Sequence, residues 1–133
     1  MPITYRVDHA RRLVWAEGHG TLTDDDLFGY QREVWSRGDV AGYGELMDMR
    51  GVEHIAEPSP VRIRELAALA ATVDPSAPRA RFAIVAPDDL AFGLGRMYEV
   101  YRSLQPASTK HVGVFRSLDE ALAFLGIESD PRA

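Results

Sequence analysis

The sequence predicts an α/β domain built on a five-stranded mixed sheet. Three observations predict it. The N-terminus has the pattern of a short hairpin, strand-like runs then alternate with helix-like stripes, and residues 82–86 form a continuous apolar run typical of a strand covered on both faces. The expected order is an N-terminal antiparallel hairpin followed by βαβαβαβα, in which the second hairpin strand is the first strand of the series.

The strands are predicted from the period of their apolar residues. Ile3, Tyr5 and Val7 alternate with polar residues, as in a half-buried strand. A short turn separates them from a second run at 13–17, and so short a connection implies antiparallel pairing. Further strands are expected at 45–49, 82–86 and 111–115.

Four helices are predicted from their start and stop signals. Thr23, Ser59 and Ser117 are expected N-caps because their hydroxyls can accept hydrogen bonds from the free N–H groups of the first turn. Pro60 suits a first helical position. The third helix is expected to open at residues 87–89. The expected stops, in chain order, are Gly38 or Gly42, residues 74–78, Pro106 and Gly126.

The order of elements also predicts where the helices lie. Crossover connections between parallel strands are right-handed, so helices that link neighbouring strands in sequence fall mainly on one face of the sheet. The opposite face is then partly uncovered. Because a large apolar face is unstable in water, we expect a second copy of the chain, in a homodimer, or another partner there.

Length and composition define the class of protein. The 133 residues fit one domain, expected over residues 1–128, with a flexible tail at 129–133. A net charge of −5 argues against nucleic-acid binding, which requires basic residues. The chain has no cysteine, no apolar signal-peptide core and no run long enough to span a membrane, so a cytoplasmic location is expected.

Motifs for catalysis are missing from the sequence. Residues 93–95, Gly-Leu-Gly, resemble part of a dinucleotide fingerprint but fall inside a predicted helix, where close packing explains the glycines better. No histidine pair has the spacing of metal ligands. We therefore expect no catalytic residues, no metal and no cofactor. If the protein were an enzyme, His19, His54 and Asp48 would be the residues to mutate.

A ligand-binding rim is the main site hypothesis. Ligands of open α/β sheets bind beyond the carboxyl ends of the strands. Asp48 is expected to end a strand, and Asp88 lies at a strand end and a helix start, where capping is the alternative role. Arg50, Arg96 and Tyr98 complete the rim, and the two arginines could together hold an anion. The alternative role of Arg96 is a solvated surface arginine, and that of Tyr98 is a core or interface aromatic.

Ser59 is a candidate phosphorylation site. A phosphate at a helix N-terminus is favoured by the helix dipole and by free N–H groups. A plain N-cap is the alternative reading of the same position.

The segment from Asp48 to Ser59 resembles the STAS domain of anti-sigma factor antagonists. That family's pattern is Asp-Leu-Ser-Gly-Val, two residues and Ile-Asp-Ser before the second helix; this chain has Asp-Met-Arg-Gly-Val at 48–52 and then Ile55. Residues 87–99 and 114–122 are similar to segments of uncharacterised bacterial proteins grouped as STAS-like and CRAL-TRIO-like. Ala56 and Glu57 replace the acidic residue and Ser of the phospho-regulated members.

The resemblance implies a STAS-like fold and a non-catalytic interaction or regulatory module, expected to be a homodimer. Fold alone does not fix function. A protein that binds a small anionic or apolar ligand is the alternative, and an enzyme of unknown reaction is the second alternative.

Overall fold

The computed structural model describes residues 2–76 and 79–128, so the predicted tail at 129–133 lies outside the described residues. Five strands form one sheet in the order β1-β2-β3-β4-β5, with β1 antiparallel to β2 and every other pair parallel. The α/β class and the mixed sheet are as predicted. The strands are β1 (Ile3–Asp8), β2 (Leu13–Leu22), β3 (Gly44–Ile55), β4 (Arg81–Val85) and β5 (His111–Phe115).

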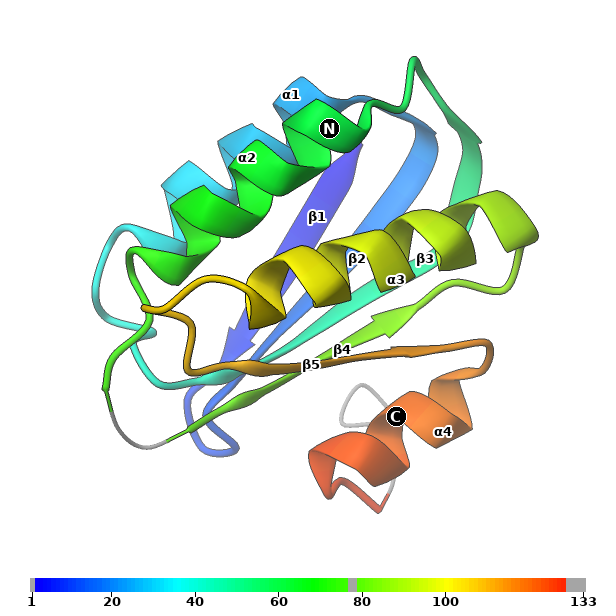
Figure 1. Ribbon diagram of the computed structural model, residues 1–133. Helices are drawn as coiled ribbons and strands as arrows, with labels where there is room; N and C mark the ends of the chain where they lie inside the picture. The colour runs from blue at the N-terminus through cyan, green and yellow to red at the C-terminus, as the bar shows by residue number, and fades with distance from the viewer. Residues whose placement is uncertain (1, 77–78, 129–133) are drawn as a thin grey trace.

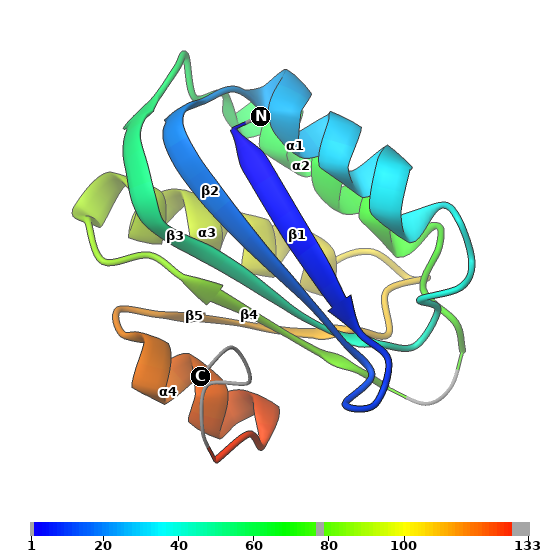
Figure 2. The ribbon, with the colours of Figure 1, turned by 180° about the vertical axis from the view of Figure 1, so that it is seen from behind.

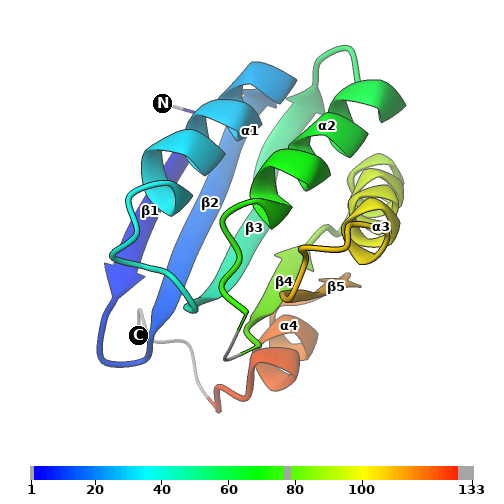
Figure 3. The same cartoon turned by 60° about the vertical axis from the view of Figure 1, so that its left-hand side comes forward.

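The first three helices cover one face of the sheet (Figures 1 and 3). They link strands that are neighbours, so right-handed crossovers place them together, as the sequence predicts. The last helix, α4, follows β5 and packs on the opposite face against β4 and β5. The helices are α1 (Asp24–Tyr30) with its π-helical continuation η1 (Gln31–Trp35), α2 (Pro60–Ala71), α3 (Asp89–Ser103) and α4 (Leu118–Leu125).

The face opposite α1–α3 differs from the expectation of an uncovered apolar surface. Leu122 of α4 is buried against the apolar side chains of β3 and β4. Figure 2 shows β1 and β2 beside α4 rather than under it. There the strands present polar side chains, including Thr4, Arg6 and Glu17. Since the apolar half is covered and the other half is polar, this face supplies no reason for a second copy, and the homodimer stays a prediction.

The predicted N-caps are confirmed. Thr23 forms a capping box with Asp26. The Ser117 hydroxyl accepts from the Glu120 N–H at 3.2 Å and donates to the Glu120 carboxylate at 3.0 Å. The Ser59 hydroxyl accepts a hydrogen bond from the Arg62 N–H at 3.4 Å. Gly126 ends α4 with φ of 76°, a left-handed conformation that glycine adopts without strain. The first helix, however, ends at Trp35 through a π-helical turn, before both glycines expected to end it.

The strand predicted at 45–49 is longer than expected. β3 continues to Ile55 beside an equally extended β2, so Asp48 lies within the strand and does not end it. The pairing of β3 with β2 shifts between Asp48 and Gly51, where β3 carries a bulge. At the bulge, the Asp48 carboxylate accepts a hydrogen bond from the Arg50 N–H at 3.0 Å. The pairing then continues to Ile55. A Cβ on Gly51 would lie 2.8 Å from the Gly18 carbonyl oxygen, so only glycine fits this close approach.

Candidate functional site: a pocket under three helices

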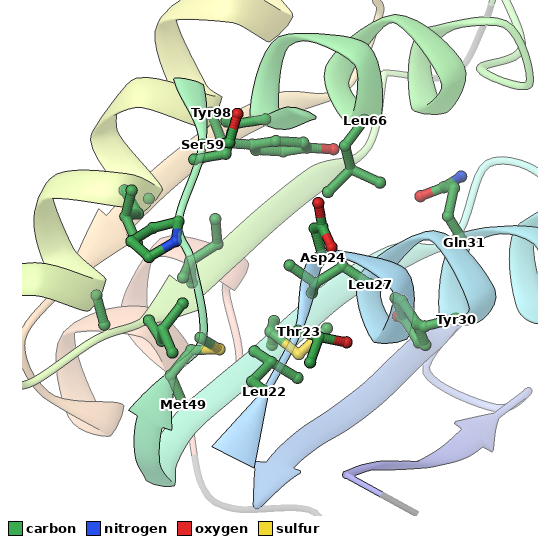
Figure 4. Close-up of a pocket in the computed structure, with 18 of the residues that line it drawn as sticks. Leu22, Thr23, Asp24, Leu27, Tyr30, Gln31, Met49, Ser59, Leu66 and Tyr98 are labelled. Atoms are coloured by element: carbon green, nitrogen blue, oxygen red, sulfur yellow. The ribbon is translucent and has the colours of Figure 1, made fainter. Parts of the chain in front are cut away.

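A pocket of about 110 Å³ lies between α1, α2, α3 and the sheet beneath them. Figure 4 shows its side chains converging from all three helices and from the strands. The apolar residues that line the pocket are Leu22, Leu27, Met47, Met49, Ile55, Ile63, Leu66, Phe82, Ile84, Ala91 and Leu94.

One end of the pocket is open, at the carboxyl ends of β2 and β3. Pro58 is exposed and Ser59 is half-buried at this end. The nearby Asp24 carboxylate accepts a hydrogen bond from the Arg62 Nε at 2.9 Å, and this contact lowers the pKa of Asp24. The Arg62 guanidinium also stacks 4.2 Å from the centre of the Phe28 ring. Arg62 therefore ties α2 to α1 beside the open end.

The inner end of the pocket rests on a buried polar cluster. The Tyr30 hydroxyl donates to Glu45 Oε2 at 2.8 Å and accepts from Trp35 Nε1 at 3.1 Å. The other Glu45 oxygen accepts from Lys110 Nζ at 3.0 Å, and Nζ lies 3.5 Å from the centre of the Trp35 ring. The side chains of Lys110 and Glu45 are 7% and 4% exposed, so this is an ion pair away from water.

A second cluster supports the other side of the inner end. Arg102 Nη1 donates to the Tyr98 hydroxyl at 2.8 Å, and Arg102 Nη2 donates to the Asp74 carboxylate. The same carboxylate oxygen accepts from the backbone N–H groups of Thr109 and Lys110 at 2.9 and 3.2 Å. Asp74 therefore fixes the segment that delivers Lys110 to Glu45.

The electrostatics of the inner end suit binding rather than proton transfer. Burial, aided by the charge of Glu45, raises the pKa of Tyr30 well above its ordinary value, and burial raises the pKa of Tyr98 to about 12. Both phenols are therefore protonated at neutral pH; the Tyr30 hydroxyl donates to Glu45, whereas the Tyr98 hydroxyl accepts from Arg102. Burial also lowers the pKa of Lys110, against the opposing attraction of Glu45.

Two residues of the predicted rim form a local pair on the far side of the sheet from the pocket. Asp48 alternates with Met47 and Met49, which line the pocket, so its side chain points to the other face. Its carboxylate accepts from Arg50 Nε at 2.9 Å through Oδ1 and 3.1 Å through Oδ2, and from Arg50 Nη2 at 2.8 Å. This pair stabilises the bulge of β3.

The other predicted rim residues divide between capping, surface and pocket. Asp88 caps α3, accepting from the Ala91 N–H at 2.8 Å. Arg96 is exposed and pairs with Glu99 one turn along the helix. Tyr98 lines the pocket. Of the five rim residues, Tyr98 is thus the one that the structure places in this cavity, and the candidate phosphorylation site Ser59 joins it there.

The residues named for the enzyme alternative do not meet in the pocket. His19 Nε2 lies 3.1 Å from the Thr4 hydroxyl on the exposed surface of β2. His54 is exposed in the extension of β3. Neither of these histidines nor Asp48 lines the pocket. Within residues 2–76 and 79–128, no group of acidic or histidine side chains has the arrangement of a metal site.

Sequence reasoning missed Gln31, Glu45 and Lys110. Gln31 interrupts the apolar stripe of the first helix, Glu45 is the first residue of the strand expected at 45–49, and Lys110 is the chain's one lysine. A polar residue at a position that periodicity assigns to the core is the signal that points to such residues. Of the glycines in residues 93–95, Gly95 behaves as expected, because a Cβ there would lie 3.0 Å from Val114 and its absence permits close packing of α3 on the sheet; Gly93 is exposed, and a Cβ there would contact nothing within 4 Å.

The fold is SpoIIAA-like, that is, STAS-like. A solved structure of an uncharacterised protein of the DUF3478 family from Shewanella loihica PV-4, described as having a SpoIIAA-like fold, aligns with 92% of this chain and 93% of its own, with a TM-score of 0.56. At 15% identity the likeness concerns the fold alone. The fold expected from the STAS resemblance is confirmed.

Comparisons of the sequence find no relative of established function. No family model matches the chain, and no curated protein matches it. In the described part of the chain, no helix is long and apolar enough to cross a membrane.

Proposed function

We propose that this domain is a non-catalytic binding module that takes up a small, largely apolar molecule in the pocket under α1, α2 and α3. The pocket itself carries the proposal: it is open at one end, apolar along its walls and closed at the other end by buried ion pairs. Small-molecule sites in proteins have this combination of apolar walls and few polar groups.

The charges around the pocket favour a neutral occupant. The described residues that line it include the carboxylates of Asp24 and Glu45 but no lysine, arginine or histidine. Both carboxylates already face a cation, Arg62 and Lys110 respectively. An anion would lose its hydration without gaining a counter-charge, which is costly. The apolar alternative is therefore preferred over the anionic one.

The test is a titration of the isotope-labelled full chain with toluene and indole, followed by NMR. We expect the shifted amides to cluster around the pocket. Leu94→Trp should abolish the shifts because the indole side chain occupies the half-buried wall of the pocket. Leu104→Trp is the matched control, since Leu104 lies just beyond the end of the same helix and is 69% exposed.

If neither probe changes the chemical shifts of amides around the pocket in the wild type, the proposal is contradicted. Shifts that persist unchanged in Leu94→Trp would also contradict it, once circular dichroism has shown that the variant is folded.

A protein-interaction module is the second candidate function. Val100 on α3 and Leu104 at the C-cap of the same helix are 52% and 69% exposed. Such exposed apolar side chains are favourable at interfaces. The homodimer belongs to this candidate, and sedimentation as a clean monomer at micromolar concentration would rule it out.

Phosphorylation of Ser59 is part of the same candidate. A phosphate on this N-cap would meet the free N–H groups of α2 and the helix dipole. Intact mass spectrometry of the protein from its native host tests the proposal, and finding the unmodified mass under every growth condition would contradict it.

A further inference from the structure

Gln31 is the polar pocket residue that the fold leaves without a role. The residue is 7% exposed, and it lines the pocket. Figure 4 shows its carboxamide on the same side of the pocket as Leu66 of α2. The other polar side chains of the pocket are engaged: Thr23 and Ser59 cap helices, Asp24 and Glu45 face cations, and the tyrosines are hydrogen-bonded.

The Gln31 carboxamide has no hydrogen-bond partner among the described residues. The buried side-chain atoms that lack both solvent and a partner do not include those of Gln31, so its amide oxygen and nitrogen are reached by solvent. Because the residue as a whole is buried and lines the pocket, a polar group of a bound molecule can meet the carboxamide there.

The backbone at this position supplies an independent observation. Gln31 is the first residue of η1, where the helix changes from α to π geometry. Single π turns inside helices occur frequently at functional sites, because they displace the side chains of one turn from their α-helical positions. The irregular turn begins at the residue whose side chain enters the pocket.

The chemistry of the carboxamide defines what it binds. An amide offers an N–H donor and a carbonyl acceptor side by side, so its complement is a neutral group that has both, such as another amide. The absence of a cation from the described lining excludes a carboxylate partner on energetic grounds. The rest of the ligand must be compact: the volume of about 110 Å³ is of the same order as a cavity of ~150 Å³ that accepts benzene.

We propose that Gln31 is the polar contact of the pocket and selects a neutral, amide-bearing ligand with a single compact apolar ring. The inference rests on the proposed function and adds to it the ligand's chemical class. The ring contacts the apolar walls, and the amide of the ligand pairs with the carboxamide of Gln31 at its buried side.

The experiment compares three probes that share one ring: benzamide, toluene and benzoate. Dissociation constants come from NMR titration of the wild type, Gln31→Met and Gln105→Met. Methionine keeps the length and unbranched shape of glutamine. Gln105 is the chain's other glutamine and lies outside the pocket, so Gln105→Met is the matched control.

We expect Gln31→Met to raise the dissociation constant of benzamide by about tenfold, the effect of losing one or two buried hydrogen bonds. Toluene affinity should be unchanged or higher in Gln31→Met, and benzoate should bind the wild type more weakly than benzamide does. Gln105→Met should behave as the wild type with all three probes. Gln31→Asn, which keeps the amide on a shorter stem, provides a second variant if Gln31→Met does not fold and should weaken benzamide less than tenfold.

The outcomes separate the two proposals. If toluene and benzamide bind the pocket but Gln31→Met weakens both equally, or neither, the role of Gln31 is overturned and the binding function stands. If none of the neutral probes shifts the pocket amides of the wild type, the binding function is overturned and this inference falls with it.

Discussion

The face of the sheet under α1, α2 and α3 differs from the face under α4 in how completely side chains fill it. α1–α3 leave a cavity and enclose ion pairs, whereas α4 forms a small apolar cluster with β2, β3 and β4. Gly113 of β5 permits the close packing of Phe124 on the sheet, because a Cβ at this position would lie 2.8 Å from the Phe115 ring and 3.2 Å from the Phe124 ring.

The two faces also differ in connectivity. α1, α2 and α3 each link neighbouring strands, so right-handed crossovers place all three on one face, with the pocket beneath them. α4 packs on the other face, where its apolar side chains meet those of β2, β3 and β4.

The largest expected effect concerns the buried charges of the pocket face. Glu45→Leu leaves Lys110 buried without its counter-charge and should lower the free energy of unfolding by about 3–5 kcal/mol, measured by urea denaturation. The double variant Glu45→Leu, Lys110→Met removes both charges and should recover most of the loss. A double variant no more stable than the single one would show that the ion pair is not what holds this face together.

The second prediction compares one leucine from each face. Leu122→Ala in the closed cluster should cost about 3 kcal/mol of unfolding free energy. Leu66→Ala should cost less, about 2 kcal/mol, because Leu66 already borders a cavity and loses fewer packing contacts. Leu104→Ala, at an exposed position, is the control and should change little. Equal costs at Leu66 and Leu122 would break the comparison between the faces.

The third prediction places the alkaline sensitivity on the pocket face. The folded pKa of Tyr98, about 12, exceeds its unfolded value of 10.0, so its contribution to stability is complete below pH 10 and is lost as pH rises toward 12. The loss from this residue is about 2–3 kcal/mol. Tyr30 adds to it in the same direction.

Urea denaturation at pH 9, 10.5 and 11.5 measures this dependence. Tyr98→Phe should start from a lower stability, having lost its contact with Arg102, but should decline less steeply with pH. An unchanged slope in the variant would assign the alkaline sensitivity to other groups.

Particular residues show how far sequence reasoning reaches. The caps at Thr23, Ser59 and Ser117 were predictable because capping is local: the hydroxyl and the N–H it binds are three residues apart. The length of β3 was not, because it depends on a bulge and on the close approach of Gly18 to Gly51 in another strand.

The candidate site divides in the same way. Tyr98 and Ser59 were singled out from the sequence, and both line the pocket. The placement of Asp48 at a strand end was wrong, since β3 continues past it to Ile55, whereas Asp88 does lie between the end of β4 and the start of α3. Glu45 and Lys110 are 65 residues apart in sequence, and no local pattern connects them.

The sequence by itself determined the order of strands and helices, the caps and the placement of three helices on one face, because these depend on local hydrogen bonds, apolar periodicity and the handedness of crossovers. The tertiary structure alone decided that α4 closes the opposite face, that Lys110 meets Glu45 and that Gln31 enters a cavity. Those features depend on distances between segments far apart in the chain, which periodicity does not encode.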